Sequence, residues 1–500
     1  MQRERPQVDL LLRFILQKQW KQRSRRTPSL HHNCLRVSSA WVARQGPSTE
    51  LHRNFSSNSP TGSPTLSLPD HPSIPSPTTL VERGEGLPRS RGQRYKRTRG
   101  SQGSRGPVPG LAFARQGLRW RLLNEGLSSH LSGMQQRRIV MLAFRRWAEV
   151  TPLIFQEDTT SPATELDIKL AFGTGRHLGC PWLFDGPGGE LAHAAHPGEI
   201  HLDDDEPYSV PPSEHGVNLL QVLLHEIGHV LGLPHLSSPD SVMHPQYPSS
   251  GSTMELSQHD RTAIQELYGQ CEGTFDTVFD WITISQQGGP AAHFNTYFLK
   301  GNQYWLYDNS RGRPRPRDPR RVEQGWGGLP SGGVDAHLHV WTPDTNRIYF
   351  FKGIQYWLYD RIAHQTITQD PEGHTYPRRI SEGFPGITGP LDTAVFSHQH
   401  GLIFFFKGHQ VWGFNMSSRQ VQKGFPKHLL DMFPPSQTRD HPTAHLDAAY
   451  YSYFHRTLFL IKGLFFWEVS SGGAGKSPSH NTVLPRRRVA EQWKDLCNVQ

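Results

Sequence analysis

The feature that most constrains the fold is a sequence unit that recurs four times after Cys271, with a period of about 55 residues. Each copy has an Asp before an apolar strand and a Lys-Gly pair before an aromatic strand. The four copies of these landmarks are Asp276, Asp335, Asp392 and Asp447, and Lys300-Gly301, Lys352-Gly353, Lys407-Gly408 and Lys462-Gly463. Four strand-rich units predict an all-β four-bladed propeller over residues 271–497, and a stacked β solenoid is the alternative.

Two of the four cysteines, Cys271 and Cys497, lie just outside the first and last repeats. A disulfide between them suits a closed ring better than a solenoid, and it would stabilise the fold by restricting the unfolded chain. Disulfides persist in oxidising compartments. Two Asn-x-Ser tripeptides, at Asn54 and Asn415, are glycosylation acceptors that fit the same compartment. We therefore expect a secreted, extracellular glycoprotein.

Residues 1–110 differ from the rest of the chain in composition and pattern. They are rich in Ser, Pro, Arg and Gly and have little apolar periodicity. Such a segment cannot offset the entropy of ordering, so we expect it to be mostly disordered. It holds 19 of the 53 Lys and Arg residues and only 6 of the 44 Asp and Glu residues. The net positive charge therefore belongs to a tail, and nucleic acid is not an expected partner.

The first 40 residues are Arg-rich and acid-poor, which fits a mitochondrial transit peptide as well as a weak secretory signal. The features of an oxidising compartment favour secretion. No apolar run of about 18 residues occurs, so no transmembrane segment is expected. At the end of this region, Arg94-Tyr95-Lys96-Arg97 (residues 94–97) has the pattern of a cleavage site for a furin-like convertase, and a plain run of solvated charges is the alternative.

Residues 111–269 have the pattern of a mixed α/β domain. Apolar residues from Ile139 to Trp147 recur at helical spacing, and Thr151-Pro152 ends this helix. The stretch from Leu166 to Phe172 then alternates in polarity as a half-buried strand does.

The most informative motif of this domain runs from His225 to His235. On a helix, His225 and His229 share one face, so both imidazoles can bind one zinc ion at ~2.0–2.1 Å. Gly232 can turn the chain out of the helix and return His235 as a third ligand, which leaves a fourth position for water. Glu226 is then the expected general base that takes a proton from this water for attack on a peptide carbonyl. A helix with two surface histidines is the alternative, and Gly232, His235 and the later Met243 count against it.

These residues resemble those of the metzincin peptidases, and among them the matrix metalloproteinases. Ser241-Val242-Met243-His244-Pro245-Gln246-Tyr247 is similar to the family's Met-turn and the wall of its S1′ pocket, and the four repeats are similar to its hemopexin-like domain. The resemblance covers about residues 118–497. It implies an α/β metzincin catalytic domain, with a twisted mixed sheet and three helices, followed by the propeller. It also implies a secreted zymogen of a zinc endopeptidase that cleaves extracellular proteins, with tissue inhibitors of metalloproteinases as partners.

The resemblance further implies metal and substrate sites. A second, structural zinc would be bound by three histidines, and a calcium ion by carboxylates and main-chain carbonyls, which suit that ion. The matching zinc ligands are His177, His193 and His201, and the calcium ligands are Asp185, Gly186, Gly188, Glu190, Asp203 and Glu206. Extended substrate would pair with the edge strand that carries Leu191 and Ala192. Gln221, Pro245 and Tyr247 would line an S1′ pocket that is not purely apolar.

The sequence also departs from the family pattern. Gly179 and Cys180 stand where the family has an Asp ligand of the structural zinc, so either Cys180 supplies a thiolate or the site is weakened, and both alternatives stay open. The short stretch between His193 and His201 predicts that one further calcium site is missing. No Pro-Arg-Cys-Gly-Val cysteine switch occurs, and Cys34 is a poor substitute. These departures leave a second function open, an extracellular binding module that acts through the propeller and has little or no peptidase activity.

Overall fold

The computed structural model describes residues 93–96, 112–195, 198–210, 216–247, 254–285, 291–342, 345–437, 439–470 and 481–499. Of residues 1–110, which were expected to be mostly disordered, the structure describes only 93–96, and these form a strand. The acceptor Asn54 and Arg97 of the convertase sequence lie outside the described residues. For Arg94 and Lys96 the structure describes the backbone only.

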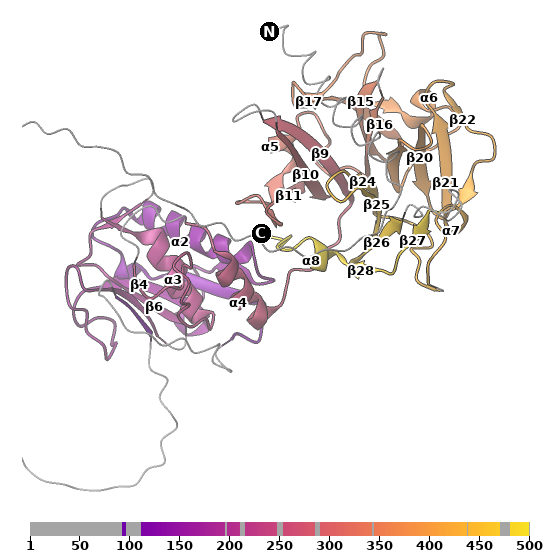
Figure 1. The fold of residues 1–500 in the computed structure, drawn as a ribbon. Coiled ribbons are helices and arrows are strands. Elements are labelled where there is room, and N and C mark those ends of the chain that lie inside the picture. The colour runs from indigo at the N-terminus through magenta and orange to yellow at the C-terminus, as the bar shows by residue number, and fades with distance from the viewer. Residues whose placement is uncertain are drawn as a thin grey trace, which may run out of the picture. The chain divides into compact units, whose positions relative to one another are not determined.

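The described residues from 93 to 268 form a six-stranded mixed sheet with three α-helices (Figure 1). The strand order is β1-β5-β6-β4-β2-β3, with parallel pairs from β6 to β3 and antiparallel pairs at β1-β5 and β5-β6. The elements are β1 Gln93–Lys96, β2 Gly117–Leu122, η1 Asn124–Gly126, α2 Gly133–Ala148, β3 Ile154–Glu157, η2 Ala163–Glu165, β4 Ile168–Gly173, β5 Glu190–Ala195, β6 Glu199–Asp203, β7 Tyr208–Ser209, β8 Val217–Asn218, α3 Leu219–Val230 and α4 Gln258–Tyr268. This confirms the expected metzincin-type α/β architecture.

The sequence patterns explain the elements around the site. The helix α2 begins at a capping box, in which the Ser132 side chain accepts from the N–H of Gln135 and the Gln135 side chain accepts in return. Its buried face includes Phe144 and Trp147, which join the same core as Leu223 and Ile227 of α3. The apolar face of each helix thus covers the sheet, and α3 lies against β5 and β6. This packing fixes the zinc-motif helix next to the edge of the sheet.

Beyond residue 271 the chain forms four sheets that repeat one plan, a four-bladed propeller (Figure 1). The blades are β9 Thr277–Ser285, β10 Ala291–Lys300, β11 Gln303–Asp308 and β12 Arg313–Pro314; β14 Ala336–Trp341, β15 Asn346–Lys352, β16 Gln355–Asp360 and β17 Gln365–Thr366; β19 Thr393–Ser397, β20 Leu402–Lys407, β21 Gln410–Asn415 and β22 Gln420–Val421; and β24 Ala448–Ser452, β25 Thr457–Lys462, β26 Phe465–Ser470 and β27 Thr482–Val483. Each third strand also pairs with a two-residue strand that leads into a short helix. These are β13 Arg320–Arg321 with α5 Val322–Gly325, β18 Arg378–Arg379 with α6 Ile380–Gly383, β23 Lys427–His428 with α7 Leu429–Met432, and β28 Arg487–Arg488 with α8 Val489–Gln492.

The two landmarks of the sequence repeat meet in one hydrogen bond of each blade. The Asp before the first strand accepts from the N–H of the landmark glycine, which lies in the turn between the second and third strands. In the second blade, Asp335 Oδ2 is 2.7 Å from Gly353 N, and Gly353 has a φ of +57°, which favours glycine. The Asp and Lys-Gly positions therefore recur because, in each blade, the Asp carboxylate binds the turn that contains the glycine to the start of that blade.

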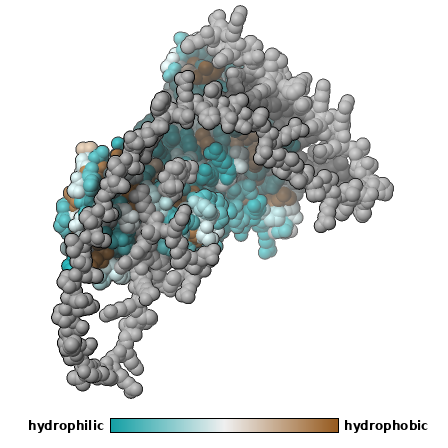
Figure 2. Space-filling view, turned by 60° about the vertical axis from the view of Figure 1, so that its left-hand side comes forward, coloured by the Kyte–Doolittle hydropathy of each residue, from teal (hydrophilic) through white to brown (hydrophobic). Residues whose placement is uncertain are grey.

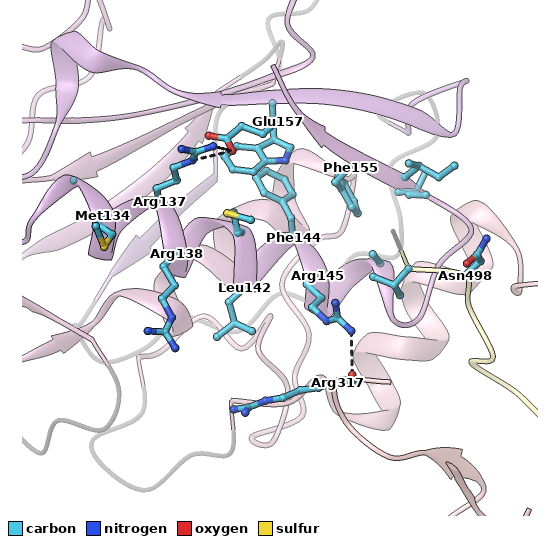
Figure 3. A pocket seen from close by; sticks show the side chains of 17 residues that line it. Met134, Arg137, Arg138, Leu142, Phe144, Arg145, Phe155, Glu157, Arg317 and Asn498 are labelled. Carbon is cyan, nitrogen blue, oxygen red and sulfur yellow. Dashed lines mark hydrogen bonds and ion pairs between the residues drawn. The ribbon is translucent and has the colours of Figure 1, made fainter. Parts of the chain in front are cut away.

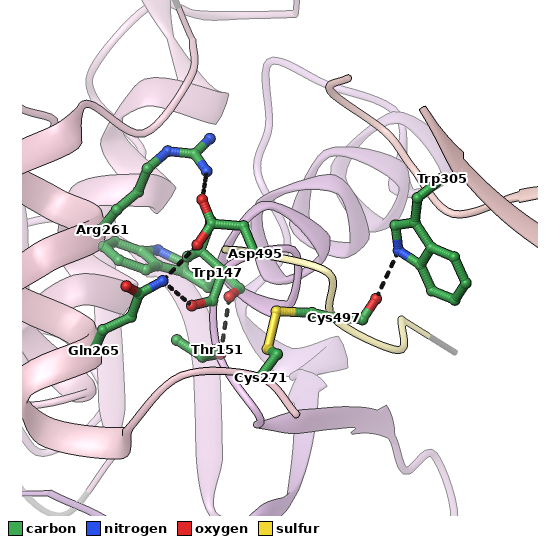
Figure 4. Close-up of a disulfide and its surroundings, with 9 residues drawn as sticks. Trp147, Thr151, Arg261, Gln265, Cys271, Trp305, Asp495 and Cys497 are labelled. Atoms are coloured by element: carbon green, nitrogen blue, oxygen red, sulfur yellow. Dashed lines mark hydrogen bonds and ion pairs between the residues drawn. A yellow bond between two sulfur atoms is a disulfide. The ribbon is translucent and has the colours of Figure 1, made fainter. Parts of the chain in front are cut away.

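The ring closes between the first and fourth blades, which excludes the solenoid. Strands β9 and β24 are in contact, and one buried core combines Phe298 of the first blade with Phe459 of the fourth and Trp493. The Cys271–Cys497 disulfide joins the two ends of the ring, and Trp305 Nε1 donates to Cys497 O at 3.0 Å (Figure 4). The disulfide expected from the sequence is thus present.

A buried carboxyl group in the first blade makes the stability of the propeller pH-dependent. Asp280 accepts hydrogen bonds from the Thr296 hydroxyl and the Tyr453 N–H, and burial raises the pKa of its carboxyl to about 6. The folded state therefore holds this proton more tightly than the unfolded chain, whose pKa is near 3.8.

We expect the difference in unfolding free energy between wild type and Asp280→Asn to change with pH, because asparagine does not titrate. The wild-type contribution is fully present below pH ~3.8 and is lost as the pH rises through ~6, a change of about 3 kcal/mol. Urea titrations of both proteins from pH 4 to 7 measure this difference. A difference that stays flat with pH would contradict the burial of an ionisable Asp280.

The surface drawn in Figure 2 is mostly hydrophilic among the described residues, and hydrophobic residues occur in small separate patches. In the part of the chain that the structure describes, none of the helices combines the length and the apolar composition that crossing a bilayer requires.

Candidate active site

Three histidines converge at the C-terminal half of α3 and the turn that follows it. The Nε2 atoms of His225 and His229 are 3.0 Å apart, and His235 Nε2 lies 3.2 Å from the first and 3.3 Å from the second. Tetrahedral ligands at ~2.0–2.1 Å from one zinc ion lie roughly 3.3 Å apart. The three nitrogen atoms therefore have the spacing of one face of a zinc tetrahedron.

Hydrogen bonds from the Nδ1 atoms of His225 and His229 orient the two rings, so that their Nε2 atoms face the place where the three histidines meet. His225 Nδ1 donates to Val242 O at 2.7 Å, and His229 Nδ1 donates to Leu233 O at 2.8 Å, so each Nε2 is left as an acceptor. Gly232 has a φ of +97°, which turns the chain out of the helix toward His235. Burial, with the charge of His235 acting in the same direction, lowers the pKa of His229 to about 3. His229 is therefore neutral, as a ligand must be.

Glu226 adjoins these histidines on α3 as a fully buried carboxylate. Among the residues that the structure describes, none makes a hydrogen bond of good geometry to either of its oxygens, although the Ala194 backbone interacts with the carboxylate. Burial first, and then the negative charge of Glu190, raise the pKa of Glu226 well above its ordinary value. An unpaired buried carboxylate is costly unless a cation or a hydrogen-bond donor faces it, so its presence fits a metal with a bound water at this site.

The turn that contains Val242 and Met243 supports His225, the first histidine of the motif. Met243 is fully buried, and Val242 O accepts the hydrogen bond of His225. Asp260 of α4 holds this turn, because its carboxylate accepts from the Ser241 hydroxyl and from Val242 N at 3.1 Å. The sequence did not point to this role of Asp260. The only available signal was the Ser-x-x-Asp capping box that starts α4 at Ser257.

We expect Gly228→Ala to destabilise the domain by about 1–3 kcal/mol, more than the gain in helix propensity, because of overpacking. A Cβ atom at Gly228 would lie 2.3 Å from Met243 Sδ and 3.1 Å from Trp147. The change in unfolding free energy of the full chain measures the effect. Gly133→Ala is the matched control, since Gly133 is also helical and a Cβ there meets nothing within 4 Å. Equal stability of the two variants would contradict the close approach of the turn to α3.

A second cluster of metal-ligand side chains includes His193 of β5 and His201 of β6. His177, Cys180, His193 and His201 are all buried, and their ligand atoms lie within 4.8 Å of one another. His193 Nδ1 lies 3.2 Å from Glu190 Oε1, which fixes the orientation of the ring. Burial lowers the pKa of His201 to about 4, with the charges of His193 and His177 acting in the same direction. The three histidines expected from the sequence are thus brought together, with Cys180 beside them.

The carboxylates expected to bind calcium also gather in one place. Asp203 and Glu206 are fully buried, and in the described part of the chain each has one oxygen without a hydrogen-bond partner. Asp185 Oδ1 accepts from Glu190 N at 2.7 Å, and Glu206 Oε1 accepts from Gly188 N at 2.6 Å. Burial raises the pKa of Asp203 to about 6, and the negative charges of Glu206 and Asp185 add to this effect. Buried like charges with unpaired oxygens fit a bound cation.

The expected substrate-contact residues lie on the elements that flank the three histidines. Leu191 and Ala192 are on β5, and Gln221 is half-buried on α3. Pro245 and Tyr247 follow the Met243 turn, and the Tyr247 hydroxyl accepts from Asn218 N at 2.8 Å, next to the start of α3. The acceptor Asn415 belongs to the propeller, at the end of β21, where its Oδ1 accepts from the N–H groups of Ser417 and Ser418.

A hollow of about 940 Å³ lies elsewhere, along the exposed side of α2 and β3 (Figure 3). Arg137, Arg138 and Arg145 project from α2 around it, and Arg137 pairs with Glu157. None of its lining residues belongs to the expected metal or substrate sites.

Comparison with known proteins agrees with this arrangement. The Matrixin family model matches residues 112–269, and the Hemopexin family model matches residues 295–331, 340–389 and 391–434. The chain belongs to the matrix metalloproteinase family.

Its relatives make the likeness more specific. The chain is 46% identical to Matrix metalloproteinase-21 of Mus musculus, over 88% of this chain and 79% of the relative. It is 47% identical to Matrix metalloproteinase-21 of Homo sapiens, over 78% of this chain and 69% of the relative. It is 50% identical to Matrix metallopeptidase-21 of Danio rerio, over 78% of this chain and 66% of the relative. The chain thus spans about two thirds of the length of several relatives that it matches.

Proposed function

We propose that the chain is a secreted zinc-dependent metalloendopeptidase that hydrolyses peptide bonds of extracellular proteins. The observation that carries this proposal is the convergence of three imidazole Nε2 atoms, 3.0–3.3 Å apart, beside the fully buried carboxylate of Glu226. Membership of the matrix metalloproteinase family supports it. Convertase processing is proposed from the basic sequence Arg94-Tyr95-Lys96-Arg97. Glycosylation and secretion are proposed from the Asn-x-Ser tripeptides at Asn54 and Asn415.

In this proposal, His225, His229 and His235 bind the catalytic zinc. When bound, zinc lowers the pKa of a water ligand and polarises a peptide carbonyl. Glu226 takes the proton of the attacking water and passes it to the leaving amine, for which a raised pKa suits a carboxylate that must both accept and return a proton. The Val242 and Leu233 carbonyls keep His225 and His229 in the tautomer whose Nε2 lone pair can bind a metal ion.

The other metal sites are part of the same proposal. His177, His193 and His201 bind a second, structural zinc, and Asp185, Asp203 and Glu206, with the carbonyls of Gly186, Gly188 and Glu190, bind calcium. Asp203 and Glu206 each have a buried oxygen that no described residue hydrogen-bonds, and these oxygens support the calcium site. Both ions would hold together the loops that lead into β5 and follow β6.

We also propose that the chain is divided into a propeptide region at residues 1–110, a catalytic domain at 111–269 and the hemopexin-like propeller at 271–497. Extracellular protein substrates and tissue inhibitors of metalloproteinases are the proposed partners. An inactive binding module is not favoured, because Glu226 and all three histidines of the motif are retained.

Metal removal tests the proposed function. The full chain, cut with a basic-specific convertase and loaded with zinc, is expected to hydrolyse a mixed peptide library, to lose this activity with a chelator and to regain it with zinc. Mass spectrometry of the library measures the products. Hydrolysis that a chelator leaves unchanged would contradict a zinc peptidase, and hydrolysis that zinc does not restore would contradict a reversible metal site.

The polar Gln221 predicts the selectivity of the S1′ pocket. In Gln221→Leu, we expect the preference for large aliphatic P1′ side chains over polar ones to rise by ~10-fold, because a leucine leaves no amide to satisfy. A P1′ peptide library measures the ratio of kcat/KM values, and Gln258→Leu, on the exposed side of α4, is the control. A wild-type profile that already favours only large aliphatic side chains would show that Gln221 does not face the pocket.

A further inference from the structure

The turn that follows β4 brings Cys180 back to the histidine cluster. Leu178 and Gly179 both have positive φ angles, and Cys180 N donates to His177 O at 2.8 Å. As a result, the Cys180 sulfur points inward and is nearly fully buried, while Leu178 is exposed. The chain thus places a thiol where it contacts imidazoles and not solvent.

The distances in this cluster are those of ligands around one ion. His201 Nδ1 lies 3.2 Å from His177 Nε2 and 3.2 Å from His193 Nε2, and Cys180 Sγ lies 3.3 Å from His193 Nε2. In a tetrahedral zinc site, two nitrogen ligands lie roughly 3.3 Å apart, and nitrogen and sulfur roughly 3.5 Å apart. The fourth corner of the cluster is therefore occupied by sulfur.

We propose that Cys180 binds the second zinc as a thiolate, which closes a site of three histidines and one cysteine. This inference rests on the proposed second zinc and not on catalysis. A closed four-ligand site leaves no position for water, so this ion has a structural role. The thiolate also supplies the one negative charge of the ligand set, and it makes the site selective for metals that bind sulfur.

Cobalt spectroscopy of the full-length chain tests this ligand. After metal removal, titration with Co²⁺ is expected to produce a near-ultraviolet thiolate-to-metal absorption band that Cys180→Ser abolishes and Cys34→Ser leaves unchanged. Zinc content should fall from two ions per chain toward one in Cys180→Ser under mild chelation. A band of equal strength in Cys180→Ser, or a wild-type thiol whose reactivity is the same with and without metal, would overturn the proposal. Peptidase activity that persists alongside such a result would leave the proposed function intact.

Discussion

Replacing Glu226 with glutamine is expected to lower kcat/KM for peptide hydrolysis by about 10²–10⁴-fold, the usual contribution of a general base. Glutamine has the same shape but cannot accept the proton of the attacking water. The three histidine Nε2 atoms do not depend on this side chain, so the variant should keep its catalytic zinc. Activity assays and metal analysis of the same preparation measure the two properties separately.

The control for this substitution is Glu266→Gln, which removes an exposed carboxylate of α4 and should leave both activity and metal content unchanged. Retention of full activity in Glu226→Gln would show that another group handles the proton. Loss of zinc together with activity would show that Glu226 acts by holding the metal site together.

Replacing both Cys271 and Cys497 with serine is expected to lower the free energy of unfolding of the propeller by about 2–5 kcal/mol. The disulfide joins residues 226 positions apart, so its loss frees a very long loop in the unfolded chain. The first and fourth blades would then be held together by their shared apolar core, which includes Phe298 and Phe459.

Denaturant unfolding followed by tryptophan fluorescence measures this loss, because Trp305 and Trp493 lie at the junction of the first and last blades. Cys34→Ser is the control for the loss of a thiol as such. An unchanged midpoint of unfolding in the double variant would show that the blade contacts alone close the ring.

Much of the fold was predictable because its determinants are local or periodic. The Asp and Lys-Gly landmarks recur once per blade, and the structure shows why, since each Asp carboxylate binds the backbone of the turn glycine. The helical spacing from Ile139 to Trp147 placed α2 correctly, although the capping box at Ser132 starts the helix two turns earlier than the apolar pattern suggests. The catalytic zinc site could also be predicted, because His225 and His229 lie four residues apart on one helix and therefore share a face.

The remaining features depend on contacts between distant residues, which no local pattern reveals. Asp260 supports the turn at Val242 from a different helix, and nothing near Asp260 in the sequence names that partner. The sequence left the role of Cys180 open, because the two positive φ angles before it decide where its sulfur points. The pairing of β1 with β5 joins segments about a hundred residues apart, and four residues are too few for a strand pattern.

Anomalous diffraction at the zinc edge, from crystals of the zinc-loaded full chain, locates the catalytic metal. We expect a peak at ~2.0–2.1 Å from the Nε2 atoms of His225, His229 and His235, with the Glu226 carboxylate facing its open side. The absence of a peak at these three imidazoles, or imidazole rings that point away from one another, would contradict this expectation.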